Sequence, residues 1–325
     1  MNAEAPAIKQ KRKKDGFIQE ITGKRRALYL MMLPGLVSVI LFSYVPMYGI
    51  VIAWKSYYPW YGIWESPWVG WKNFNEFISS PWLFTILRNS TAISLMKLAV
   101  NIPAPMILAL MLNEIRSRKF KRAAQTITYL PHFLSWVIIY GIFFFIFNES
   151  YGAFNNLRVM LGFERISFLT RKSIFWQVLT LSSTWRSIGW GSIIYLAAIS
   201  GINPELYESA VIDSASKWQQ TIYITIPQLL PVFAIMMILA LGNILNGDFE
   251  QIFMFMGGVE NTFMQDVGEV FETHVYRTGL FNVRDGLTRY SYAATVDIFK
   301  NFFGLFLVVM ANSFAKRKLN YRGVF

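Results

Sequence analysis

Six long apolar stretches constrain this 325-residue chain more than any other feature of its sequence. A bilayer core is about 30 Å thick, so a helix that rises about 1.5 Å per residue needs roughly 20 apolar residues to cross it. Stretches of about this length lie at 27–54, 86–112, 127–147, 175–200, 228–245 and 292–311. Lipid offers the backbone no hydrogen-bond partners, so each stretch is predicted to be helical. The predicted fold class is an all-α integral membrane protein with six transmembrane helices.

The overall composition agrees with a membrane protein. Hydrophobic residues make up 54% of the chain and charged residues only 15%, a balance too apolar for an ordinary soluble domain of this length. The net charge of +12 does not indicate nucleic-acid binding, because the basic residues form short clusters between apolar stretches. Since there is no cysteine, disulfides and thiolate metal sites are excluded. Residues 1–26 lack an apolar core and so do not resemble a cleavable signal.

Two of the predicted spans have unusual composition. The fourth is the most polar, with serine, threonine, arginine and glycine crowding residues 182–192, so it should face other helices. Small residues at four-residue spacing, Ser183, Ser187 and Gly191, would let the backbones approach closely. Prolines in spans one and two predict kinks or local unwinding; they are Pro34, Pro46, Pro103 and Pro105.

Orientation follows from the lysines and arginines that flank the spans. Eight lie in the N-terminal segment up to Arg26, five follow span two at 116–122, and four lie in the C-terminal tail. Six spans place all three clusters on the cytoplasmic side, with both termini inside. The segment 148–173 carries four basic residues on the opposite, external side and weakens the pattern. The predicted organisation is a basic cytoplasmic tail at 1–26, a membrane domain at 27–312 and a second cytoplasmic tail at 313–325.

The predicted cytoplasmic loop between spans four and five, residues 201–227, has helix signals of its own. Asn203 is suited to cap a helix whose first residue is Pro204, with Glu205 near the positive end of the helix dipole. A second helix is predicted to run from about Lys217 into span five, broken by Pro227. The loop should therefore form a helix-turn-helix that projects from the membrane.

This loop resembles the permease subunits of binding-protein-dependent ABC importers. Their motif is Glu-Ala-Ala, two variable residues, Asp-Gly-Ala, and then a spaced Ile-x-Leu-Pro. The same spacing holds here for Glu208, Ser209, Ala210, Asp213, Ser214, Ala215, Ile224, Ile226 and Pro227. Serine replaces alanine at Ser209 and glycine at Ser214, and isoleucine replaces leucine at Ile226. Ser214 matters most, because glycine suits a left-handed turn at a helix end and serine is strained there.

The resemblance implies that residues 201–227, the coupling loop below, form a cytoplasmic coupling helix that docks into a separate ATPase subunit. The implied coupling residues are Glu208, Ala210, Asp213, Ser214, Ala215 and Pro227. Small alanines permit close docking, and the two acids offer charge-assisted hydrogen bonds to a partner. The alternative is a solvated amphipathic loop whose acids only cap helices.

Resemblance over nearly the whole chain points to the oligosaccharide and polysaccharide branch of the carbohydrate permeases, in which permeases of alginate importers are one candidate group. The matching runs are Leu33–Gly35, Tyr44–Gly49, Trp68–Phe74, Leu112–Ile115, Tyr129–Phe133, Phe249–Ile252 and Val275–Arg277. Such permeases reside in the bacterial inner membrane with a second permease subunit, two ATPase subunits and an external solute-binding protein. The resemblance implies a transport subunit that is not an enzyme and holds no cofactor, while the partner ATPases bind ATP and Mg. The sequence contains no P-loop motif.

Charged residues inside the predicted spans are candidates for the translocation path, because burying a charge in lipid is costly. They are Arg186, Lys300 and Asp297. Arg186, the most central, either contacts a sugar or uronate carboxylate or ties two spans together. Asp297 and Lys300 share a helix face and are expected to neutralise each other. Lys97, near a span end, is expected to extend its amine toward the interface.

Other candidate centres are weaker. Tryptophans and tyrosines between 54 and 71 are typical of a membrane-interface belt, with sugar stacking or binding-protein docking as the alternative. His132 and His274 lie in different regions, and no metal site is predicted. Glu269 and Glu272 could be mistaken for a glycosidase pair, but nothing around them resembles such a site. An ion-driven secondary transporter is the alternative function; it would require inverted repeats and acids at mid-membrane.

Overall fold

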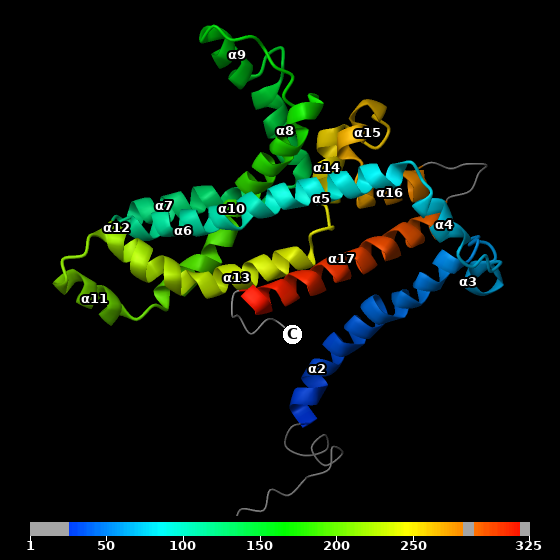
Figure 1. Ribbon diagram of the computed structural model, residues 1–325, viewed down its shortest axis with the longest axis horizontal. Coiled ribbons are helices and arrows are strands. Elements are labelled where there is room, and N and C mark those ends of the chain that lie inside the picture. Colours follow the sequence, from blue (N-terminus) through cyan, green and yellow to red (C-terminus); the bar gives the residue numbers. More distant parts are fainter. Residues whose placement is uncertain (1–25, 282–288, 319–325) are drawn as a thin grey trace, which may run out of the picture. The chain divides into compact units, whose positions relative to one another are not determined.

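The structure is a computed structural model that describes residues 26–281 and 289–318 (Figure 1). Within these ranges the regular elements are helices, with one isolated antiparallel bridge between Lys55 and Trp68. The all-α fold class predicted from the apolar stretches is confirmed. Residues 1–25 and 319–325, which make up most of the two predicted tails, lie outside the described residues.

The chain divides into two compact units, of which the first ends at Val51. It contains α2 (Arg26–Val39), a π-helix η1 (Ile40–Tyr44) and most of a 3-10 helix η2 (Val45–Trp54). Pro34 lies inside α2 without ending it, whereas Pro46 lies where the π-helix gives way to the 3-10 helix. The local unwinding predicted for span one is therefore confirmed, because proline cannot donate the hydrogen bond that an α-helix needs.

The second unit, residues 52–325, holds the remaining elements. Up to the coupling loop these are α3 (Gly62–Glu65), α4 (Lys72–Ile78), α5 (Trp82–Asn101), α6 (Pro103–Glu114), α7 (Arg118–Tyr129), η3 (Leu130–Phe133), α8 (Trp136–Phe147), α9 (Ala153–Met160), η4 (Lys172–Ile174) and α10 (Phe175–Ser200). From the loop onward they are α11 (Pro204–Ile212), α12 (Lys217–Gln220), η5 (Thr221–Thr225), α13 (Ile226–Gly242), α14 (Phe249–Met256), α15 (Thr262–Gly268), α16 (Phe271–Tyr276), η6 (Arg277–Phe281) and α17 (Tyr290–Lys318).

Four helical segments in the described part of the chain are long and apolar enough to cross a membrane. They are Leu28–Trp54, Trp82–Glu114, Lys217–Gly242 and Tyr290–Met310. A bent pair, Arg118–Phe133 with Trp136–Phe147, brings the number to five if it forms one span. The fourth predicted span forms a single helix of 26 residues, α10, but its serines, threonines and Arg186 keep it outside this apolar set. The count of six spans stays a prediction.

The third predicted span, 127–147, is wrong as a continuous helix. The chain bends by 109° between α7–η3 and α8. Pro131 lies in the 3-10 turn η3, and the Ser135 side chain then caps α8 by accepting a hydrogen bond from the Ile138 amide. A proline and a new N-cap within five residues end one helix and start another, although hydropathy continues across the break.

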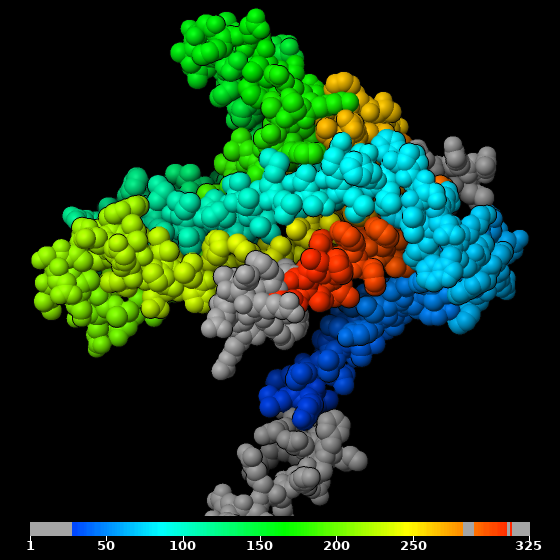
Figure 2. Space-filling model, viewed as in Figure 1, coloured from blue at the N-terminus to red at the C-terminus, as the bar shows by residue number. Residues whose placement is uncertain are grey.

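The polar helix α10 packs against α5, α6, α7 and α13, so the prediction that this span faces other helices is confirmed. Ser182, Ser183 and Ser192 are buried, and Asn101 of α5 donates to Ser183 and accepts from Thr184. α7 approaches α10 closely at Gly189, where an added Cβ would lie 2.0 Å from the Thr128 carbonyl oxygen. By contrast, α9 projects away from the long helices in the space-filling view (Figure 2), whereas Trp136, Ile139 and Phe143 of α8 pack in the same buried cluster as α10.

Candidate functional sites

The coupling loop forms the predicted helix-turn-helix. α11 begins at Pro204, and the Asn203 side chain accepts a hydrogen bond of 3.1 Å from the Glu205 amide. Figure 1 draws α11 at one end of the long helices, connected by loops on both sides. The cap, the proline at the first helical position and the acid in the first turn all act at the same helix end. These three local signals explain why sequence alone located this short helix.

The turn after α11 is a complete Schellman motif built on a serine. The Ala215 amide donates to the Ala210 carbonyl at 2.8 Å, and the Ser214 amide donates to the Val211 carbonyl at 3.0 Å. Ser214 has φ 59°, the only positive φ of a non-glycine residue in the described chain. The family's glycine position therefore keeps its left-handed conformation despite the substitution, at a steric cost of the order of 1 kcal/mol.

The second arm of the loop differs from expectation at Pro227. Ser216 and Gln219 form a capping box that starts α12. The helix then continues from Lys217 to Gly242, with the π-helix η5 directly before Pro227, so the predicted break is wrong. A π-turn widens the helix by one residue, which accommodates the proline ring and its missing amide hydrogen without ending the helix.

The coupling loop exposes apolar as well as acidic side chains. Glu208 and Asp213 are exposed, while Ala210 and Ala215 are half-buried. Ile212 is 83% exposed and Trp218 is 73% exposed, larger apolar surfaces than a solvated loop normally presents. Sequence reasoning missed Ile212 because it occupies a variable position of the motif. The feature that could have identified it is a bulky apolar residue directly before Asp213, the polar residue that caps the end of α11.

Arg186 lies near the middle of α10 without an anionic partner. Its guanidinium carbon is 4.7 Å from the centre of the Trp136 ring, a cation–π contact between α10 and α8. The structure gives its side chain no hydrogen bond or ion pair within the described residues, and Nε is buried without a partner. The contact with Trp136 joins α10 to α8, as a role in fastening two helices requires. The unsatisfied N–H donors of Arg186 can also bind an anionic ligand, as a role in the translocation path requires.

A small cavity of about 240 Å³ lies beside Arg186's neighbour on α10, Ser187. His132 and Trp190 form part of its wall, with ring planes 3° apart and ring centres 4.5 Å apart. Asn101 contributes a polar group from α5. An amide and a stacked aromatic pair are groups that can contact a sugar, whereas Arg186 is not part of this cavity wall.

The other charged residues of the predicted spans are neutralised within the chain. The Lys300 amine lies 3.0 Å from Asp297 and 3.3 Å from Glu272 of α16, and its side chain is 11% exposed. Burial raises the pKa of the Glu272 carboxyl, and the Lys300 ammonium acts in the opposite direction. Lys97 is 14% exposed and its amine lies 3.7 Å from Asp248, which is 46% exposed, so an acid of the chain pairs with it, and its extension toward the interface stays a prediction. These contacts favour a structural role for Lys300 and Asp297.

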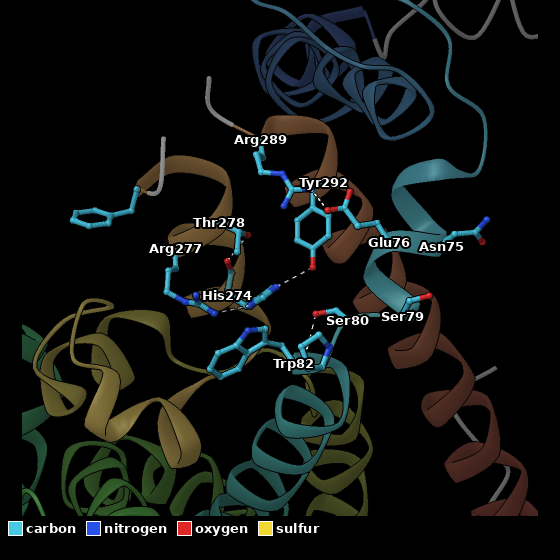
Figure 3. A pocket seen from close by; sticks show the side chains of 12 residues that line it. Asn75, Glu76, Ser79, Ser80, Trp82, His274, Arg277, Thr278, Arg289 and Tyr292 are labelled. Atoms are coloured by element: carbon cyan, nitrogen blue, oxygen red, sulfur yellow. Dashed lines mark hydrogen bonds and ion pairs between the residues drawn. The ribbon is translucent and has the colours of Figure 1, made fainter. Parts of the chain in front are cut away.

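A buried polar cluster lies where α16, η6 and the start of α17 meet α5 (Figure 3). Glu269 is fully buried, and its Oε1 accepts from Nε of Arg277 at 2.9 Å and from Nη2 at 2.5 Å. The two ring nitrogens of His274 contact Glu269 at 2.9 Å and the Tyr292 hydroxyl at 3.2 Å. Arg277 also covers the Trp82 ring at 4.8 Å. The cluster fastens three helical elements through one buried carboxylate.

This cluster borders a polar cavity of about 1090 Å³ (Figure 3). Arg289 and Glu76, which form an ion pair, also line it. Arg277 and Arg289 each pair with an acid and each cover an aromatic ring, so neither is a free cation in the described lining of this cavity. Glu269 and Glu272, considered together from the sequence, pair with different cations. His274 was missed as a structural residue, since its partners lie in other elements.

Comparison with known proteins places the chain among transport components. A family model described as "Binding-protein-dependent transport system inner membrane component" matches residues 101–296, which include Arg186 and the coupling loop. The polygalacturonan/rhamnogalacturonan transport system permease protein YteP of Bacillus subtilis (strain 168) is 40% identical over 320 residues, covering 97% of this chain and 96% of that protein. Protein LplB of the same strain is 38% identical over 298 residues, covering 92% and 91%.

A solved structure is similar over almost the whole chain. It is the crystal structure of a bacterial alginate ABC transporter in complex with an alginate pentasaccharide-bound periplasmic protein. The match has a TM-score of 0.82 and 34% identity, and covers 95% of this chain and 99% of the other. Its coverage extends to the segments on both sides of the residues matched by the family model.

Proposed function

The chain belongs to the family of binding-protein-dependent transport system inner membrane components, and from this premise we propose that it imports acidic oligosaccharides as one permease subunit of an ABC transporter. Two of the proteins named above are described as transporters of polygalacturonan or rhamnogalacturonan and of alginate, polymers that contain sugars with carboxylates. The observation that carries the proposal is Arg186, a guanidinium within a helix of the transport domain that has no anionic partner of its own. Family membership also favours an ATP-driven importer over the ion-driven alternative.

In this proposal the chain forms half of the translocation path, and a second permease subunit forms the other half. An external solute-binding protein delivers the sugar, and two separate ATPase subunits bind ATP and Mg²⁺ and supply the driving force. The solved alginate transporter, which includes a periplasmic protein, supports the solute-binding partner. Co-purification of the chain with ATPase subunits, together with transport that needs ATP but no ion gradient, tests this arrangement. Transport that continues without ATP and collapses with the ion gradient would contradict it.

The coupling loop is proposed to dock on an ATPase subunit. Its exposed surface combines the carboxylates of Glu208 and Asp213 with the apolar side chains of Ile212 and Trp218. Such a surface can place an apolar anchor in a groove while the acids bind arginine, lysine or backbone donors of the partner. The Schellman turn holds the two acids in a defined position relative to Ile212.

Replacement of Glu208 or Asp213 by alanine is expected to weaken ATPase docking by about tenfold or more, because each loses charge-assisted hydrogen bonds. ATPase stimulation by sugar-loaded binding protein should fall accordingly, while the binding protein's own affinity for sugar stays unchanged. Ser214→Gly is the matched control, since it relaxes the strained turn and keeps both acids. Normal stimulation and transport in both alanine variants would remove the docking role.

The orientation of the chain is proposed from its basic clusters, with both termini and the connection 113–122 in the cytoplasm. Because the chain contains no cysteine, single cysteines can be introduced without background. A cysteine at position 118 is expected to resist an impermeant thiol reagent in intact cells and to react after permeabilisation. A cysteine at position 156, in the predicted external segment, should react in both conditions. Labelling of position 118 from outside would overturn the orientation.

Arg186→Met keeps much of the side chain's length and removes its charge. If Arg186 contacts the sugar carboxylate, transport of an acidic oligosaccharide should fall by about tenfold or more while assembly and thermal stability persist. If its main role is the contact with Trp136, the variant should lose stability, because a cation–π interaction of about 1–2 kcal/mol is removed. The thermal midpoint should then fall before transport does. Trp136→Leu separates the two, since it removes the contact but keeps the cation. Full transport by a stable Arg186→Met protein would end the substrate-contact proposal.

A further inference from the structure

The first turns of α7 carry cationic side chains that have no partner in the described structure. The cluster comprises Arg116, Arg118, Lys119, Lys121 and Arg122. Within residues 26–281 and 289–318 none of these side chains forms a hydrogen bond or an ion pair. All are exposed except Lys121, which is half-buried. Glu114, at the end of α6, is the acid closest in sequence, and it too is exposed and unpaired.

The basic residues of the segment 148–173 behave differently. Each of them has a polar partner within the chain: Arg158 donates to the Glu164 carbonyl, Arg165 to the Glu149 and Ser150 carbonyls, Arg171 to Ser173, and Lys172 pairs with Asp266. The charges at the start of α7 are therefore not a general property of the surface. They form a concentrated positive field that residues 26–281 and 289–318 leave uncompensated.

Three of these cations surround a hollow. Arg118, Lys119 and Arg122 line a shallow depression of about 600 Å³, together with Ala123, Thr126 and Ile127. The two arginines are four residues apart and so lie one above the other on the same face of the helix. The depression therefore presents two guanidinium groups and an ammonium beside an apolar floor. A phosphate diester with attached hydrocarbon matches both parts.

An exposed apolar strip continues from this hollow along α7 and η3. Phe120 is 64% exposed and Ile127, seven residues later on the same face, is 71% exposed. Leu130 and Phe133 extend the strip and are also exposed. At the rise of an α-helix, the strip from Phe120 to Phe133 is about 20 Å long. This length exceeds the thickness of a headgroup layer and is comparable to the length of an acyl chain in one leaflet.

The packing of α7 on α10 prevents the helix from rotating to bury these cationic and apolar side chains. The Thr128 carbonyl lies against Gly189 of α10 so closely that a Cβ there would sit 2.0 Å away. This contact fixes the C-terminal end of α7 on α10, and Figure 1 draws its N-terminal end at the same end of the long helices as α11. The basic end is therefore at the proposed cytoplasmic surface, where the anionic headgroups of the inner leaflet lie.

We propose that the depression formed by Arg118, Lys119 and Arg122 binds the headgroup of an anionic phospholipid, whose acyl chains lie along Phe120, Ile127, Leu130 and Phe133. The guanidinium groups bind phosphate oxygens through paired N–H donors, and Lys119 adds a point charge. The lipid neutralises the field at the start of α7 and covers a strip that would otherwise face another protein or water. The site is independent of the transported sugar.

The test uses the complete transporter in nanodiscs of phosphatidylcholine alone or with added phosphatidylglycerol. The wild-type thermal midpoint should rise with phosphatidylglycerol, and native mass spectrometry should find phosphatidylglycerol retained after detergent extraction. In Arg118→Gln/Lys119→Gln/Arg122→Gln the apparent affinity for phosphatidylglycerol should fall by about tenfold or more, since each cation near an anionic surface contributes comparably. The control Lys11→Gln/Lys13→Gln/Lys14→Gln removes the same charge from the N-terminal segment and should respond like wild type.

Three outcomes would overturn the proposal. The first is an equal response of the triple variant and wild type to phosphatidylglycerol. The second is an equal loss in the control, which would show diffuse attraction only. The third is a loss of subunit assembly in pure phosphatidylcholine, which would assign the surface to a protein partner. If the triple variant does not fold, Lys119→Gln/Arg122→Gln should still show a smaller loss of lipid affinity. Inorganic phosphate added to phosphatidylcholine discs should give no stabilisation, which separates a lipid from free phosphate.

Discussion

Replacement of Arg277 by methionine is expected to lower the free energy of unfolding by about 3–5 kcal/mol, because it leaves the buried Glu269 carboxylate without its cation. Glu269 has no exposure to solvent, and both of its hydrogen bonds from Arg277 would be lost. Thermal or denaturant unfolding of the purified chain in detergent measures the loss.

Two further variants make this prediction specific. Arg289→Met removes a guanidinium that pairs with Glu76 at side-chain exposures of 32% and 46%, so its cost should be about 0–1 kcal/mol. The double variant Arg277→Met/Glu269→Met should recover most of the stability, because it removes the uncompensated charge together with its partner. Equal losses for Arg277→Met and Arg289→Met would show that the cluster does not have the structural role assigned to it.

The substitution Gly189→Ala is expected to disturb the packing of α7 on α10. Its Cβ would lie 2.0 Å from the Thr128 carbonyl oxygen and 2.4 Å from the carbonyl carbon, and backbone atoms cannot rotate away as a side chain can. Overpacking of this kind costs about 1–3 kcal/mol, and separation of the two helices would cost more. A fall in the thermal midpoint, with weaker protection of residues 124–129 from proteolysis, is the expected result.

Gly141→Ala is the matched control for this substitution. Gly141 lies inside α8 with nothing within 4 Å of an added Cβ. Alanine there should be neutral or stabilising by up to about 1 kcal/mol, because it has the higher helix propensity. Similar destabilisation by both substitutions would mean that helix flexibility, and not the contact with Thr128, governs the effect.

The coupling loop was the part of the candidate site most fully predictable from sequence. Asn203, Pro204 and Glu205 signal a helix start within three residues, and the motif spacing from Glu208 to Pro227 lies within one segment. The structure confirms the helix start and shows that Ser214 adopts the left-handed conformation despite the loss of the family's glycine. It corrects the break expected at Pro227, because a π-turn relieved the proline locally. No local pattern distinguished these two ways of accommodating a proline.

Residues that pair across the fold were not predictable in the same way. Nothing near Lys97 in the sequence indicated that Asp248, about 150 residues later, would lie 3.7 Å from its amine. Glu269 and His274 carried no motif, yet together with Arg277 and Tyr292 they form the most buried polar cluster described above. Their spacing along the chain matches no catalytic or metal-binding pattern, so only the folded arrangement identifies them.

By itself the sequence determined the class of this protein, its apolar helices and its coupling loop. Hydropathy, helix caps and motif spacing depend on residues within a few turns of one another, so the local chain encodes them fully. Only the tertiary structure decided which cations meet which acids, where α7 bends into α8, and that α7 packs closely on Gly189. These features depend on distances between segments far apart in the sequence, and those distances are set by the packing of the whole helical unit.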